Sequence, residues 1–161
     1  MAGVSAPTWT IEGPRHAGIT VSDLDRSLDF YCGVLGLELR SRRLYEERQI
    51  AEIVAVPEAT AWDIAFLRLP GSDVEIELLE YKGCERHSGS VRPSDYGTGH
   101  FAMFVSDIEA LYADLAVRGV VFRSVGPVEH RAGPNAGAKS LYAHDPDGYI
   151  IEFTQRSPQA A

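Results

Sequence analysis

The chain has 161 residues, 45% of them hydrophobic, enough to bury a core as one domain or as two small modules packed together. Its formal charge of -8 argues against a nucleic-acid partner, because binding phosphates needs clustered Lys and Arg side chains. No apolar run approaches the roughly 18 residues of a membrane span, no secretory signal opens the chain and its two cysteines are isolated, so we expect a small-molecule partner and a cytoplasmic location.

The chain contains an internal duplication. Residues 16–25, HAGITVSDLD, are nearly repeated 84 positions later (100 minus 16) as HFAMFVSDIE in residues 100–109. Each copy predicts a strand followed by a helix, with Ser22 or Ser106 as the N-cap and an acid three residues on in a capping box. Alternation along the strand places the histidine on the face opposite the helix. Two modules of one kind are therefore expected.

The first module is predicted to run strand, helix and three strands. Residues 1–11 read as a loose arm and residues 12–81 as the module. A helix is expected from Leu24 to Leu35, ended by Gly36, because its apolar residues recur at helical spacing. Strands are predicted at these positions: residues 16–21, 37–43, 62–69 and 74–81.

Two features of the first module allow alternative interpretations. Residues 45–61 are too long for a simple turn and predict a short helix in a loop, either a lid over a substrate or a cover on the core. Arg40, Arg42 and Arg43 lie at the far end of a predicted strand. A solvated strand end is the simpler interpretation, and recognition of phosphate or carboxylate is the alternative.

The second module is predicted to repeat this order. Residues 82–98 read as a connector, in which His87 is a solvated loop histidine. Residues 99–155 form the module and residues 156–161 a tail. After the helix, which ends at Gly119, the sequence predicts a strand at 120–123, a loop at 124–138 and a hairpin of strands 139–143 and 149–154. The predicted fold is α+β, with two tandem βαβββ modules.

One histidine opens each module, and one glutamate lies in each module's last strand: His16 with Glu77, and His100 with Glu152. An unpaired carboxylate in an apolar strand is costly, and a cation removes that cost. Singly, each residue would more often be a hydrogen-bonded histidine or a solvated glutamate. Packing alone does not require both types at matched places in both modules, so a metal site is favoured. The other histidines are not expected to be ligands: His87, His130 and His144.

These segments resemble the vicinal oxygen chelate superfamily, which includes glyoxalase I, methylmalonyl-CoA epimerase, extradiol dioxygenases, and fosfomycin and bleomycin resistance proteins. The resemblance covers roughly residues 12–155 and is carried by HAGITVSDL, FY through VLGL, IEL, GHFA and DPDGY through Glu152. It implies a cup-shaped mixed sheet around one divalent metal, with ligands His16, Glu77, His100 and Glu152. Because the superfamily commonly pairs modules between chains, a homodimer is also expected.

Two imidazoles and two carboxylates suit Zn, Ni, Co, Mn or Fe(II). An octahedral metal would keep two adjacent open positions for a substrate with two neighbouring oxygens, whose enediolate or enolate it stabilises as Glu152 or Glu77 takes the proton. A glyoxalase-like lyase or isomerase, or an epimerase, therefore ranks first. The alternatives are an Fe(II)-dependent extradiol dioxygenase, which needs three open positions, and an antibiotic-binding resistance protein, which does not need four ligands.

Two features depart from the superfamily patterns. Epimerases usually have Gln where this chain has Glu77, and residues 45–61 are not part of the compact bacterial glyoxalase pattern. No particular substrate follows from the sequence.

Overall fold

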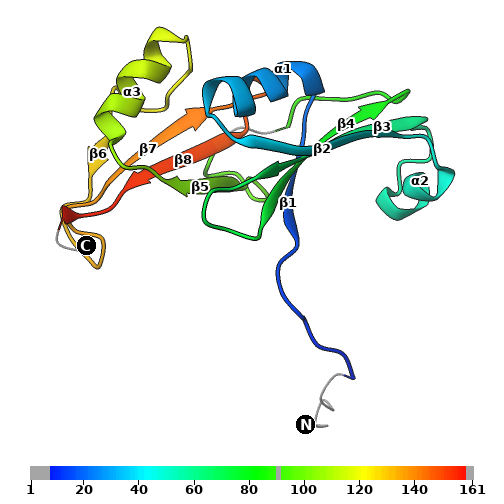
Figure 1. The fold of residues 1–161 in the computed structure, drawn as a ribbon, viewed down its shortest axis with the longest axis horizontal. Coiled ribbons are helices and arrows are strands. Elements are labelled where there is room, and N and C mark those ends of the chain that lie inside the picture. Colours follow the sequence, from blue (N-terminus) through cyan, green and yellow to red (C-terminus); the bar gives the residue numbers. More distant parts are fainter. Residues whose placement is uncertain (1–7, 90–91, 159–161) are drawn as a thin grey trace.

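The protein is described by a computed structural model that covers residues 8–89 and 92–158. Its strands form two four-stranded mixed sheets of the same internal order (Figure 1). The first sheet consists, in spatial order, of β1 (His16–Thr20), β4 (Glu75–Lys82), β3 (Ala61–Arg68) and β2 (Glu38–Tyr45). The second consists of β5 (His100–Phe104), β8 (Ile150–Gln155), β7 (Lys139–His144) and β6 (Val128–Glu129). In each sheet the first and last strands of the module pair in parallel and the other neighbours are antiparallel, so the α+β fold of two tandem modules is confirmed.

A helix follows the first strand of each module, as predicted, but its cap is one residue later. Helix α1 (Leu24–Leu28) continues as the π-helix η1 (Asp29–Val34), and α3 is Ile108–Val117. The N-caps are Asp23 and Asp107, whose carboxylates accept backbone N–H groups of the first turn. The prediction of Ser22 and Ser106 as caps was therefore wrong. The Ser22 hydroxyl donates to Asp147 instead, over 2.6 Å.

Both helices lie on the same side of the two sheets (Figure 1). In the first module Ile19, Ile76 and Leu78 are at most 4% exposed and belong to the core that α1 and η1 cover. Phe153 and Leu141 occupy the same side of the second sheet, beneath α3, and join the same cluster. The predicted alternation is confirmed, because the histidine of each first strand faces away from this core.

The turn between β7 and β8 joins the second module to the helix of the first. Tyr31 of η1 donates to the Asp145 carboxylate over 3.1 Å, and Arg26 of α1 forms an ion pair with Asp147. Asp145 is 5% exposed and Tyr31 is fully buried, and its own burial raises the pKa of each group; the neighbouring Asp145 raises the pKa of Tyr31 further. Residues far apart in sequence therefore fix how the two modules meet.

The segment after α3 differs from the prediction. Residues 120–123, predicted to be a strand, contribute only an isolated bridge between Phe122 and Ala143, and the short strand β6 lies inside the predicted loop. Val120, the residue after Gly119, belongs to the end of the helix, because its backbone N–H donates to the carbonyl of Leu115. Pairing resumes only beyond Pro127, which has no N–H to give to a ladder.

The helix predicted within residues 45–61 is present as α2 (Arg48–Val54). Its buried residue Ala51 packs with Trp62 in a second apolar cluster, which also includes Leu79 and Tyr81. Leu79 and Tyr81 lie on the histidine face of the first sheet, so α2 covers one end of that face. Among the described residues, no helix has the length and apolar character needed to cross a bilayer.

Candidate metal centre

The first His–Glu pair lies on the open face of the first sheet. Nε2 of His16 is 3.2 Å from Oε2 of Glu77, with the two side chains 26% and 16% exposed. Parallel pairing of β1 with β4 sets Gly18 beside Glu77. A Cβ at Gly18 would lie 3.3 Å from Glu77 Oε2, so the glycine leaves room for the carboxylate to turn toward His16. The imidazole packs on Phe66, with ring centroids 5.6 Å apart.

The second pair repeats this geometry on the second sheet. Nε2 of His100 is 3.1 Å from Oε2 of Glu152, and β5 sets Ala102 beside Glu152 as β1 sets Gly18 beside Glu77. The ring of His100 packs against Tyr142, with centroids 5.3 Å apart. Each module therefore presents one imidazole nitrogen and one carboxylate oxygen as a preformed pair.

The donor atoms of both pairs fit a divalent metal. Adjacent octahedral ligands with bonds of about 2.1 Å lie about 3.0 Å apart, close to the separation of nitrogen and oxygen in each pair. The nitrogen and oxygen of each pair thus already have nearly the spacing of two neighbouring ligands. A metal could lie between them with little movement of either strand.

The two pairs do not meet in one chain. Within the part of the chain that the structure describes, no three His, Cys, Asp or Glu side chains gather closely enough to hold a metal. The structure thus brings His16 to Glu77 and His100 to Glu152, but it does not bring the four residues together. Nδ1 of His16 is buried and has no hydrogen-bond partner among the described residues. Each chain presents two half-sites, defined here as the His16–Glu77 pair and the His100–Glu152 pair.

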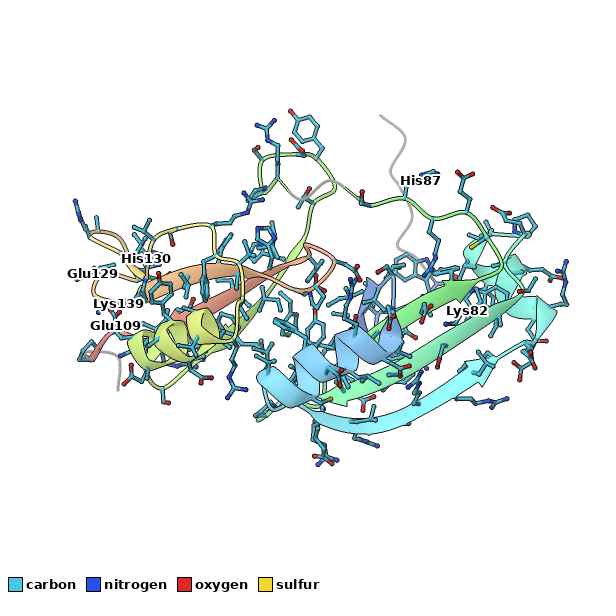
Figure 2. The ribbon with its side chains drawn as sticks, turned by 90° about the horizontal axis from the view of Figure 1, so that it is seen from above. Lys82, His87, Glu109, Glu129, His130 and Lys139 are labelled. Atoms are coloured by element: carbon cyan, nitrogen blue, oxygen red, sulfur yellow. The ribbon has the colours of Figure 1, made fainter. Side chains whose placement is uncertain are left out.

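The three other histidines lie outside both half-sites. Nε2 of His130 contacts the Ser140 hydroxyl at 2.9 Å, and Nδ1 of His144 contacts the carbonyl of Gly148 at 2.9 Å. The His87 side chain is 79% exposed in the connector, and Figure 2 shows it well separated from His130.

The arginines near the end of β2 are already paired with carboxylates. Arg42 donates two hydrogen bonds to Asp63, over 3.1 and 2.8 Å, and holds the pKa of that carboxyl below its usual value. Arg40 lies 3.4 Å from Glu75, and Arg43 lies 2.6 Å from Glu47. Recognition of phosphate by this cluster is therefore not favoured.

The two half-sites have unlike neighbours. In the first sheet Glu77 lies opposite Phe66, and Leu79 lies opposite Ile64. In the second sheet the matching places hold hydroxyl groups: Tyr142 lies opposite Glu152, and Ser140 lies opposite Thr154. Ser140 and Thr154 were not singled out from the sequence. Aligning the two predicted hairpins position by position would have revealed them.

A cavity of about 920 Å³ lies where the connector passes over the two modules. It is lined by Thr20 and Tyr81, which share the open face of the first sheet with Glu77, by Arg86 and Cys84, and by Tyr149 of the second module. Its size is sufficient for a small-molecule ligand.

The chain is similar to several metabolic enzymes over most of its length. It is 31% identical over 145 residues to a probable lactoylglutathione lyase of Synechocystis sp., which covers 88% of this chain and 94% of that protein. It is 31% identical over 142 residues to a 2-epi-5-epi-valiolone epimerase of Actinomyces sp., covering 86% of this chain and 76% of the epimerase. A lactoylglutathione lyase of Arabidopsis thaliana is also 31% identical over 148 residues, but the match spans only 44% of that longer protein.

A solved structure shares the fold. The glyoxalase family protein from Bacillus cereus superposes with a TM-score of 0.79 at 19% identity, covering 95% of this chain and 99% of that protein. The model of the Glyoxalase/Bleomycin resistance protein/Dioxygenase superfamily matches residues 13–153, which include both half-sites. These similarities and the duplicated fold lead to one conclusion: the chain belongs to this superfamily, the vicinal oxygen chelate proteins, and its relatives include lyases and an epimerase.

Proposed function

We propose that the protein is a metal-dependent lyase or isomerase of the glyoxalase I kind, or an epimerase, which moves a proton on the carbon next to a carbonyl group. The observation that carries this proposal is the matched geometry of the two His–Glu pairs. The relatives named lactoylglutathione lyase and 2-epi-5-epi-valiolone epimerase support the same class of reaction. The substrate is a small molecule with two neighbouring oxygens, and the protein acts in the cytoplasm, where Cys32 and Cys84 stay reduced.

We also propose that the metal site is completed between two chains. Because one chain keeps its half-sites apart, four ligands meet only where the His16–Glu77 half-site of one copy faces the His100–Glu152 half-site of another. A two-fold axis would make this contact twice, giving a homodimer with two sites and one metal per chain. The metal would be Zn, Ni, Co, Mn or Fe(II), all suited to two imidazoles and two carboxylates.

The residues of the chain have two roles in this reaction, metal binding and proton transfer. When bound, the metal supplies positive charge that stabilises the charge developing on the substrate oxygens. A carboxylate beside it takes the proton from the neighbouring carbon and returns it to the product. Glu152 and Glu77 are the candidates for this base, and the imidazoles of His16 and His100 remain as neutral ligands.

Mixing two inactive variants tests the shared site. If the site is shared, a dimer of one His16→Ala chain and one His100→Ala chain contains one site with both histidines intact. Random exchange should then restore about a quarter of wild-type activity, since half of the dimers are mixed and each has one intact site of two. Sites built within one chain would give no recovery. Sedimentation of the wild type at micromolar concentration should show a dimer, and a clean monomer would contradict the proposal.

Screening for turnover tests the reaction. Metal content should first be measured on protein purified without added metal. The protein should then be assayed without oxygen, with Zn, Ni, Co or Mn, on thiol adducts of 2-oxoaldehydes, branched acyl-CoA thioesters and catechols. We expect turnover of a carbonyl substrate with hydrogen exchange from solvent. Activity only on catechols with Fe(II) and oxygen would establish a dioxygenase, and tight binding of a drug without turnover would establish a sequestering protein.

A further inference from the structure

The face that carries Glu152 also holds a row of hydroxyl groups. Thr154 Oγ1 donates to Glu152 Oε1 over 3.2 Å, and Ser140 Oγ lies 2.9 Å from Thr154 Oγ1. Nε2 of His130 lies 2.9 Å from Ser140 Oγ. The other carboxylate oxygen, Oε2, faces His100. The glutamate is thus held through both oxygens.

The row has only one consistent direction. Each hydroxyl carries one proton, so Thr154, which donates to Glu152, must accept from Ser140. Ser140, having donated to Thr154, must in turn accept from His130, which places the His130 proton on Nε2. Hydrogen bonds aligned head to tail strengthen one another, so the carboxylate at the end of the row is held more firmly than by one hydroxyl alone.

The far end of the row lies beside open space. His130 lines a cavity of about 510 Å³ together with Glu129, Lys139 and Arg131. Figure 2 shows His130, Glu129 and Lys139 gathered at the outer end of the second sheet. His130 is anchored at its base, since its backbone N–H donates to the carbonyl of Ala138 over 2.8 Å. The first residue of the row, His130, therefore has a backbone position that is fixed by a hydrogen bond.

The first module has no counterpart of this row. The residues at the matched positions, Leu79 and Ile64, have no hydroxyl and pack in the apolar cluster with Trp62. In the first module, aliphatic side chains therefore satisfy the packing at these two positions. Both modules have the His–Glu pair, but the row is found beside only the second pair, so the His–Glu contact itself does not require the row.

We propose that Thr154, Ser140 and His130 are positioning residues, which orient the Glu152 carboxylate as the proton-transferring base. This inference rests on the proposed function, because it assigns the base role to Glu152 rather than to Glu77. A hydroxyl that donates to one oxygen limits rotation of the carboxylate, and a base must be held in line with the C–H bond it attacks.

The first test needs neither metal nor substrate. In the metal-free protein, the carboxyl ¹³C resonance of Glu152, assigned by its loss in Glu152→Gln, should shift in Thr154→Val and in Ser140→Ala. The ¹⁵N spectrum of His130 should show the proton on Nε2 and should change in Ser140→Ala. Ser41→Ala, a strand serine in the other module, is the matched control and should move neither resonance. Unmoved Glu152 and His130 signals in both variants would overturn the row.

The second test measures turnover. Thr154→Val should lower kcat by roughly tenfold, the effect of one hydrogen bond to a charged group, with KM and metal content unchanged. Thr154→Ser, which keeps the hydroxyl, should restore kcat to within about twofold. Equal losses in the valine and serine variants would contradict a positioning role. If the resonances shift but no carbonyl substrate is turned over, the row stands and the proposed function fails.

Discussion

The two half-sites have the same His–Glu pair but different neighbouring side chains. His16 and Glu77 lie among Phe66, Leu79 and Ile64, whereas His100 and Glu152 lie among Tyr142, Thr154 and Ser140. Burial raises the pKa of Tyr142, and the charge of Glu152 raises it further. Both modules thus carry an imidazole and a carboxylate at matched places, whereas the neighbouring side chains differ. Under the proposed function, a carboxylate that acts as the base needs control of its orientation as well as its position.

The largest expected effect distinguishes the role of Glu152 from that of Glu77. Glu152→Gln should lower hydrogen exchange into substrate by roughly 100-fold to 10,000-fold, because the amide has no basic site. Some metal should remain bound. In Glu77→Gln the main loss should be in metal affinity, with exchange retained once metal is supplied in excess. Isotope exchange followed by NMR, together with metal analysis, checks this. Equal behaviour of the two variants would mean that the half-sites are equivalent.

Truncating a buried side chain on the helix-covered face should lower the free energy of unfolding by a similar amount in either module. Leu78 and Phe153 occupy matching buried positions in a single core cluster. Leu78→Ala should lower the free energy of unfolding by about 2–5 kcal/mol, and Phe153→Ala by about 3–5 kcal/mol. Each variant should unfold in one transition in urea. Ile53→Ala on the exposed side of α2 serves as the control, with little change. Two separate transitions would show that the modules do not form one cooperative unit.

The ion pair between Arg42 and Asp63 in the first module should give a smaller, pH-dependent effect. Arg42→Met leaves Asp63, which is 8% exposed, without its guanidinium partner, and should cost about 1–2 kcal/mol after allowing for the partial exposure of Arg42. Arg42 lowers the pKa of Asp63, so the pair stabilises the fold above the unfolded pKa of about 3.9. The difference from wild type should be full at neutral pH and shrink as the pH falls below about 4. Urea unfolding at several pH values measures it, and a difference that grows in acid would contradict the assignment.

The smallest effect should come from adding one hydroxyl to the first half-site. Leu79→Thr places a hydroxyl two residues after Glu77, but Ile64 opposite it offers no group to continue a row. We expect kcat and metal content to stay within about threefold of wild type. A large gain or loss in kcat would mean that a single hydroxyl, without the rest of the row, is enough to alter the glutamate's role.

The sequence by itself determined the features that depend on local periodicity. The repeated segments predicted two modules, and alternation with a period of two placed His16 and His100 on the faces away from the helices. The helix within residues 45–61 also followed from local spacing. The predictions were wrong where two adjacent residues could each serve as the N-cap of a helix: the caps are Asp23 and Asp107, not the predicted serines.

Only the tertiary structure decided which side chains meet. The register of β1 on β4 and of β5 on β8 pairs each histidine with the glutamate of its own module, and the buried contact of Tyr31 with Asp145 helps fix how the modules join. The pairing of β6 with β7 and of β7 with β8 brings His130, Ser140 and Thr154 into a row that ends at Glu152. These contacts join residues far apart along the chain, so they depend on strand pairing and packing, which no local pattern in the sequence specifies.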